Sequence, residues 1–158
     1  MTPRPAQTLS LKGRALRYLA AREHSRAELA TKLARHVAPE DDPDAVARVL
    51  DELAAKGFID EARVAESVLH RRAGRLGGAR VLQELRAKGL PDEVVADAAA
   101  QLRSTELARA QAVWRRKFGQ PPAVAAERAR QLRFLAARGF SGDVARRALG
   151  GAADDDDF

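Results

Sequence analysis

The chain of 158 residues carries a net charge of +6 and 46% hydrophobic residues, but only 4% of its residues are aromatic and none is cysteine. The lack of cysteine excludes disulfides and thiolate metal sites, and no segment has the apolar length of a signal peptide or of a membrane span, which needs ~20 residues. We therefore expect a cytoplasmic protein with a packed core and no contact with a membrane.

Alanine, leucine, arginine and glutamate dominate the chain, which favours helices over strands, and no segment reads as a credible strand. After a start that we expect to be disordered, the first helix is predicted from about Leu11 to Arg22. Ser25 and Glu28 then form a capping box, in which each side chain satisfies an exposed amide of the next helix. Leu29 continues that helix as the first residue of its apolar stripe.

A break at residues 38–43 separates this helix from the third one. Asp42 can cap the third helix, and Pro43 suits its first turn. The helix is predicted to end at Gly57, which supplies the left-handed conformation of a C-cap, while Phe58 folds back onto the preceding turn.

The same cycle then returns further along the chain. The segment Leu85–Leu90 (LRAKGL) recurs as Leu135–Phe140 (LAARGF), 50 residues later, and each copy closes an amphipathic helix. Ser104 is predicted to cap the first helix of the last repeat, where Trp114 belongs to the core. A helical unit of roughly 50 residues that recurs three times indicates a repeat array. The predicted fold is all-α, an elongated array of three tandem three-helix repeats. The repeats are expected at residues 11–59, 60–103 and 104–150. A disordered N-terminus at 1–10 precedes them, and a flexible acidic tail at 151–158 follows.

Basic residues gather in the second half of the chain. Residues 1–60 contain 10 Lys and Arg against 9 Asp and Glu, whereas residues 61–153 contain 18 against 9. Such asymmetry points to a polyanion or an acidic protein surface as partner, although a solvated helical surface gives the same pattern. The four carboxylates of Asp154–Asp157, with Phe158, either keep the chain soluble or compete for this basic surface.

Four segments, in order, resemble the motifs of the RecX family, which regulates the recombinase RecA, and the resemblance extends from about Leu16 to Leu149. Val64 stands where the family has an aromatic residue, and residues 120–122 form a short, stiff junction before the last two helices of the third repeat. The motifs are Glu23–Leu29 (EHSRAEL) with Lys32 and Leu33, Gly57–Glu66 (GFIDEARVAE), Arg71 and Arg72 with Gly77, Gly78 and Glu84–Leu90 (ELRAKGL), and Lys117 and Phe118 with Arg138–Ser141 (RGFS).

The resemblance implies a monomeric, non-enzymatic modulator that lies in the groove of the RecA filament on DNA. It implies inhibition of the ATPase and of strand exchange, and thereby regulation of DNA repair, without a cofactor. Weak direct contact with DNA is compatible with the basic repeats. The residues expected to bind the filament are Arg71, Arg72, Arg75, Arg80, Lys88, Arg115, Arg116, Lys117, Arg130 and Arg133.

Two other classes of function are weaker. A winged-helix DNA-binding protein would begin in the same way, but it needs strands after Ile59, and its recognition helix would present Asp51 and Glu52 to the phosphates. An enzyme is disfavoured because His24, His36 and His70 lack metal-ligand spacing and no thiol is present, so we predict no catalytic, cofactor-binding or metal-binding residues.

Overall fold

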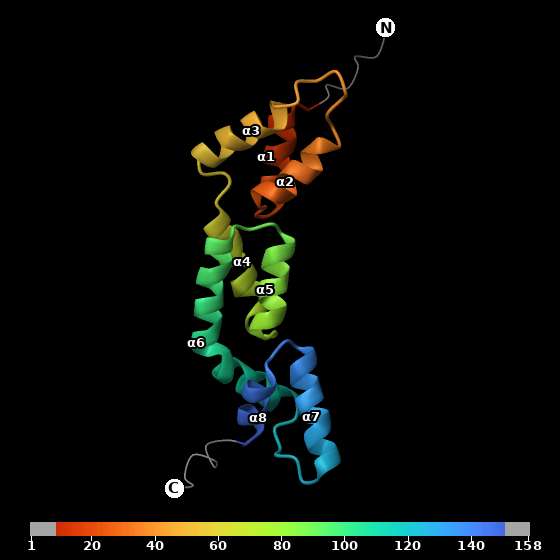
Figure 1. Cartoon of the computed structure of the whole chain (residues 1–158), viewed down its shortest axis with the longest axis vertical. Coiled ribbons are helices and arrows are strands. Elements are labelled where there is room, and N and C mark those ends of the chain that lie inside the picture. The colour runs from red at the N-terminus through yellow and green to blue at the C-terminus, as the bar shows by residue number, and fades with distance from the viewer. Residues whose placement is uncertain (1–8, 151–158) are drawn as a thin grey trace. The chain divides into compact units, whose positions relative to one another are not determined.

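The computed structural model describes residues 9–150, and every regular element in that range is an α-helix (Figure 1). The predicted all-α fold class is confirmed. The predicted tail at 151–158, and residues 1–8 of the predicted disordered start, lie outside the described residues. The helices are α1 (Leu11–Ala21), α2 (Arg26–Ala34), α3 (Ala45–Ala55), α4 (Glu61–Arg72), α5 (Gly78–Ala87), α6 (Asp92–Lys117), α7 (Ala125–Ala137) and α8 (Gly142–Gly150).

The chain folds into two compact units. The first unit extends to Val64 and also includes Lys88–Leu90; the second comprises Ala65–Ala87 and the chain from Pro91 onward. In the first unit, α1, α2 and α3 enclose a core of fully or almost fully buried leucines and alanine, which are Ala15, Leu29, Leu33, Leu50 and Leu53.

The capping box at the start of α2 is confirmed. The Ser25 hydroxyl accepts a hydrogen bond from the Glu28 amide at 3.0 Å, and the Glu28 carboxylate accepts one from the Ser25 amide at 3.1 Å. Both groups satisfy amides that the first helical turn leaves without a partner. The predicted entry into α2 therefore follows from local chemistry alone.

The ends of α3 differ in detail from the prediction. The helix begins at Ala45, so Pro43 precedes it, and the Asp42 carboxylate accepts from the Asp44 amide instead of capping a helical turn. Gly57 ends the helix with φ +80°, as predicted. The Phe58 amide bonds back to the Leu53 carbonyl at 2.9 Å, while Phe58 is 47% exposed and Ile59 takes the buried position.

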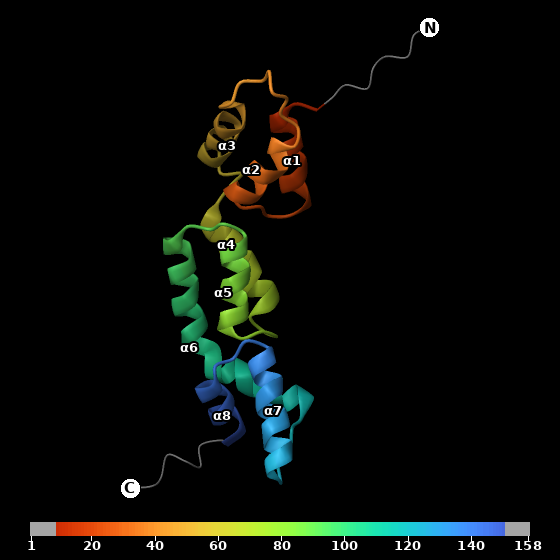
Figure 2. The same ribbon diagram turned by 45° about the vertical axis from the view of Figure 1, so that its right-hand side comes forward.

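Helix α6 spans 26 residues without a break, and the prediction that Ser104 caps a new helix is wrong. The Ser104 hydroxyl donates to the Gln101 carbonyl at 2.7 Å, and the Thr105 hydroxyl donates to Leu102 at 3.5 Å. Such bonds from serine and threonine back to the preceding turn bend helices. Figures 1 and 2 show α6 changing direction along its course, so one helix serves as the last of the second repeat and the first of the third.

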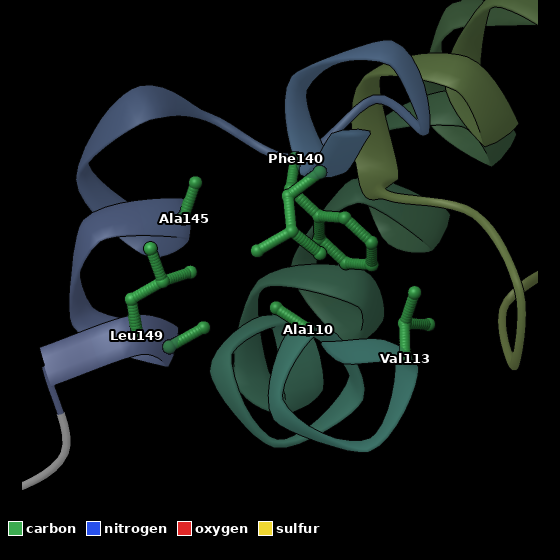
Figure 3. Close-up of a cluster of buried hydrophobic side chains, with 7 residues drawn as sticks. Ala110, Val113, Phe140, Ala145 and Leu149 are labelled. Atoms are coloured by element: carbon green, nitrogen blue, oxygen red, sulfur yellow. The ribbon is translucent and has the colours of Figure 1, made fainter. Parts of the chain in front are cut away.

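The core of the second unit is clearest where α6, α7 and α8 meet. Phe140 lies between α6 and α8, facing Ala110 and Val113 on one side and Leu149 on the other (Figure 3). Trp114 packs partly buried against this cluster, as predicted, and its indole N–H donates to Gln131 at 2.8 Å. The buried amide of Gln131 thus meets the hydrogen-bonding need of the only tryptophan.

Gly77 allows the loop after α7 to touch the start of α5. The Gly77 amide donates to the Arg138 carbonyl at 2.7 Å, and a Cβ atom on Gly77 would lie 2.2 Å from the carbonyl carbon of Gly139. Arg80 donates from its guanidinium to the Ala137 carbonyl at 2.8 Å beside this contact. No side chain other than hydrogen fits at position 77 without moving backbone.

The first unit contains an equivalent contact. The Ser25 hydroxyl donates to the Lys88 carbonyl, and a Cβ atom on Gly89 would lie 2.6 Å from Cβ of Ala27. In both units, therefore, a loop that ends one helix covers the N-terminus of another, 61 to 63 residues away in the chain.

Replacing Gly77 by alanine is expected to destabilise the second unit by about 3 kcal/mol, because overpacking at this backbone contact requires the chain to shift. Chemical denaturation measures the loss. Gly74→Ala is the matched control: a Cβ there meets nothing within 4 Å, and its φ is not positive. The control should leave the free energy of unfolding unchanged or slightly raised. Equal stability of the two variants would contradict the tight contact.

A second prediction concerns acid stability. Burial raises the pKa of Glu28, but hydrogen bonds from Arg22 and the Ser25 amide and the charge of Lys88 outweigh it, lowering the pKa from 4.5 to about 2. A carboxylate with a lowered pKa stabilises the folded state above its unfolded pKa, and that contribution disappears as the pH falls from about 5 to 2. In Glu28→Gln, the free energy of unfolding should depend less on pH between about 5 and 2. At neutral pH it should be lower than in the wild-type protein by up to about 3 kcal/mol. The prediction would be contradicted if the free energy of unfolding of this variant fell between pH 5 and 2 as steeply as that of the wild-type protein.

Candidate polyanion-binding site

Most cations of the first unit are paired with carboxylates. The ion pairs are Lys12–Glu52, Arg22–Glu28, Arg26–Asp51, Arg48–Asp42, Lys56–Glu52, Arg63–Glu23, Arg63–Asp60 and Lys88–Glu28. Among the described residues of the second unit, by contrast, only Arg72–Glu84 and Arg109–Glu106 lie within ion-pair distance. The positive charge available to a partner therefore lies on the second unit.

Four of these cations surround one hollow, which we call the basic hollow. Its volume is about 340 Å³, and no carboxylate of residues 9–150 lines it. The cations come from three places in the sequence: the turn after α4, the last turn of α6 and the residue that ends α7. The lining residues are Arg75, Val113, Arg116, Lys117, Phe134 and Arg138.

Neutral groups hold these cations in place. The Arg116 guanidinium donates to the Gly74 carbonyl at 2.7 Å, and Arg75 makes a longer bond of 3.5 Å to the Arg71 carbonyl. Lys117 and Arg138 lie over the Phe134 ring, 5.5 and 4.9 Å from its centre. Carbonyl groups and an aromatic ring carry no net charge, so these contacts do not neutralise the four cations. Their full positive charge is therefore available to attract an anion.

A purely structural role for these cations also has a physical basis. Arg75, Lys117 and Arg138 lie at or just beyond the C-terminal ends of helices, where the helix dipole favours positive charge by roughly 0.3–1 kcal/mol each. That role predicts a loss of stability when the charges are removed, whereas a binding role predicts a loss of affinity in a folded protein.

The structure brings together three of the predicted binding residues and places the others nearby or elsewhere. Arg75, Arg116 and Lys117 line the basic hollow. Among the exposed ones, Arg115 lines a second hollow with Trp114, and Arg130 lies 5.8 Å from the centre of the Phe118 ring. Arg71 and Arg133 are also exposed.

The remaining three predicted residues hold the fold together. Arg72 pairs with Glu84 at 3.4 Å and so joins α4 to α5. Arg80 supports the contact at Gly77. Lys88 belongs to the first unit, and its side chain is only 15% exposed beside Glu28.

Arg138 lines the hollow but is missing from the predicted site. A signal was available in the sequence: a basic residue stands directly before three of the four glycines with positive φ that follow a helix, as Lys56, Lys88 and Arg138. The signal identifies the class of position, but not which of the three faces a hollow. That depends on the neighbouring helices.

Residues 9–150 give little support to the other classes of function. No strand occurs among them, so the wing of a winged-helix domain is absent from this part of the chain. Within the same range, no three His, Cys, Asp or Glu side chains are arranged to hold a metal ion. His24 is buried, with Nδ1 3.0 Å from the Arg22 carbonyl and Nε2 2.7 Å from the Lys32 ammonium; burial lowers the pKa of this imidazole.

No helix in the described part of the chain is long and apolar enough to cross a membrane.

Family models match the chain in three consecutive segments. The model described as RecX, first three-helix domain, matches residues 12–53; the second three-helix domain matches 60–98, and the third matches 104–149. The last two matches end and begin within α6. The second and third three-helix domains of the family therefore share one continuous helix, α6, in this chain.

Curated relatives and solved structures carry the same description. The regulatory protein RecX of Leptothrix cholodnii is 60% identical over 89% of this chain and 88% of the relative, and that of Ralstonia nicotianae is 52% identical over 94% and 91%. The crystal structure of RecX from Lactobacillus salivarius superposes with a TM-score of 0.73, covering 88% of this chain and 92% of that one at 18% identity. This structural likeness shows a shared fold.

Charge reversal in the basic hollow should weaken binding to a polyanion without unfolding the protein. We expect Arg75→Glu combined with Arg116→Glu to lower affinity for heparin at least tenfold. The slope of log affinity against log salt concentration should also decrease, because fewer counterions are displaced. Elution from a heparin column at increasing salt, and titration at several salt concentrations, measure both effects.

The matched control is Arg103→Glu combined with Arg147→Glu, which changes the net charge equally at exposed positions outside the hollow. It should lower affinity far less. Equal losses in the two double variants would show that only total charge matters, and a collapse of the melting temperature in the first would favour the structural role.

Proposed function

Because the chain belongs to the RecX family of regulatory proteins, we propose that it binds the RecA filament on DNA and inhibits its ATPase, recombinase and strand-exchange activities. In this proposal the protein is a non-enzymatic modulator of RecA that regulates recombination and DNA repair. It acts as a monomer in the cytoplasm and uses no cofactor.

The observation that carries the proposal is the unbalanced charge of the second unit. A filament of recombinase on DNA is a polyanion, and its field attracts a surface where, within residues 9–150, few cations lie at ion-pair distance from a carboxylate. The first unit, with its paired cations, has little charge to offer. We therefore infer that the second unit makes the main electrostatic contact.

The proposed contact residues fall into two groups. The exposed ones bind the filament directly: Arg71, Arg75, Arg115, Arg116, Lys117, Arg130 and Arg133. Arg72, Arg80 and Lys88 contribute by keeping helices and loops in place while retaining charge near the surface. Arg138 joins the first group because it lines the basic hollow.

A second candidate function is direct, sequence-independent binding of DNA by the helical repeats. The basic hollow favours it, because cations without carboxylate neighbours attract phosphates whether or not a recombinase is present. Titration with DNA alone separates this function from filament binding.

Inhibition should occur at well below one molecule of this protein per recombinase subunit. Three consecutive three-helix domains give one chain enough surface to contact more than one subunit of a polymer. The measurement is the ATPase rate of the cognate recombinase on single-stranded DNA with increasing amounts of this protein. Arg75→Glu with Arg116→Glu should require several-fold more protein for the same inhibition. A folded wild-type protein that fails to inhibit at equimolar amounts would refute the proposed function.

A further inference from the structure

The basic hollow contains more than cations. Its lining includes the ring of Phe134 and the side chain of Val113, and the Arg138 guanidinium lies over that ring. Phosphate groups alone require neither an aromatic ring nor an aliphatic wall. The apolar part of the hollow therefore points to a ligand with a flat apolar portion next to its negative charge.

We propose that the basic hollow binds one nucleotide of single-stranded DNA, with its phosphates on Arg75, Arg116 and Lys117 and its base on the Arg138 guanidinium, which lies over the Phe134 ring. The proposal rests on the proposed function and deepens it, because it assigns this hollow to the DNA strand and not to the recombinase. It applies to the protein alone as well as to the filament.

The phosphate side of the hollow is formed in advance. Arg116 is fixed by its bond to the Gly74 carbonyl, which uses one guanidinium nitrogen and leaves the others available. Lys117 is the next residue of α6, and Arg75 approaches from the turn after α4. Guanidinium groups can meet two phosphate oxygens at once, which makes them suited to a backbone phosphate.

The base side is held by aromatic contacts. Phe118 meets Phe134 edge to face, with ring centres 5.3 Å apart and planes at 86°, so the Phe134 ring has a defined orientation. Arg138 covers this ring at 4.9 Å, and its own backbone is fixed by the bond from Gly77. Unstacked bases pack on aromatic rings and on guanidinium planes alike.

The size and chemistry of the hollow select a single strand. A volume of about 340 Å³ lies at the small end of pockets for small ligands, which hold roughly 300–1,000 Å³. In a duplex each base is paired and stacked, so its flat face is not available to the Arg138 guanidinium that lies over Phe134. A single strand offers both a phosphate and a free base, and therefore should bind more tightly than a duplex of equal charge.

An acidic peptide is the main rival occupant, and the chain itself contains one. Asp154–Asp157 and Phe158 offer carboxylates and a ring, and they follow α8, whose last residue, Gly150, lines a hollow with Trp114 and Arg115 of α6. Deletion of residues 154–158 distinguishes this occupant from DNA.

The test is fluorescence anisotropy of the full chain with a short labelled oligothymidylate, compared with a strand of equal length and charge that lacks bases. Wild-type protein should bind the thymidine strand about tenfold more tightly than the abasic strand. Phe134→Leu should abolish this difference while keeping affinity for the abasic strand. Arg116→Ala should weaken binding to both strands.

Two further variants make the result decisive. Phe58→Leu removes an exposed phenylalanine in the first unit, and should change neither affinity. Arg138→Lys keeps the charge but removes the flat guanidinium, so it should lower the preference for bases even if Phe134→Leu proves less stable. Thermal melting of each variant checks that it is folded.

Equal affinity of the wild-type protein for the two strands would overturn the proposal, as would an unchanged preference in Phe134→Leu. Binding that appears only after deletion of residues 154–158 would also overturn it, because the hollow would then hold the chain's own acidic segment. Failure of the proposed function is a separate result: the ATPase assay can show no inhibition while the oligonucleotide preference, which needs no recombinase, remains.

Discussion

The turn between α4 and α5 depends on two arginines of α6. A helix end leaves carbonyl groups without partners, and the turn at residues 73–77 adds further ones. Arg109 donates to the carbonyls of Ala73 and Leu76 at 2.9 and 2.7 Å, and Arg116 donates to that of Gly74. With its carbonyls occupied, the turn presents the Gly77 amide to the Arg138 carbonyl.

This arrangement links the fold to the candidate site. Arg116 both completes the turn and lines the basic hollow, and Arg138 both accepts the bond from Gly77 and covers Phe134. Arg109 has a different position, since it also pairs with Glu106 and is largely buried. The same residue type therefore serves the interior at one position of α6 and the surface two turns later.

Local features of the fold could be predicted from the sequence, and features that depend on distant contacts could not. The capping box at Ser25 and the C-cap at Gly57 involve residues within one or two turns, so their patterns are sufficient. Ser104 carries an equally good local signal, yet α6 continues through it, because its two halves pack against different helices of the second unit. The basic hollow combines the turn after α4 with residues of α6 and α7. Arg72 and Arg75 look alike in the sequence, although within residues 9–150 only Arg72 lies at ion-pair distance from a carboxylate.

The continuity of α6 makes the length of this helix a functional quantity. Each residue of an α-helix turns the chain by about 100° and advances it by 1.5 Å. A single residue inserted near Ser104 would therefore rotate the second half of α6, together with the Phe134 ring that packs on it, by more than a quarter of a circle, carrying Arg116 and Lys117 away from Gly74 and Arg75 in the turn after α4. The number of residues between the two ends of α6 sets the phase of the helix, and that phase decides which side chains reach the hollow.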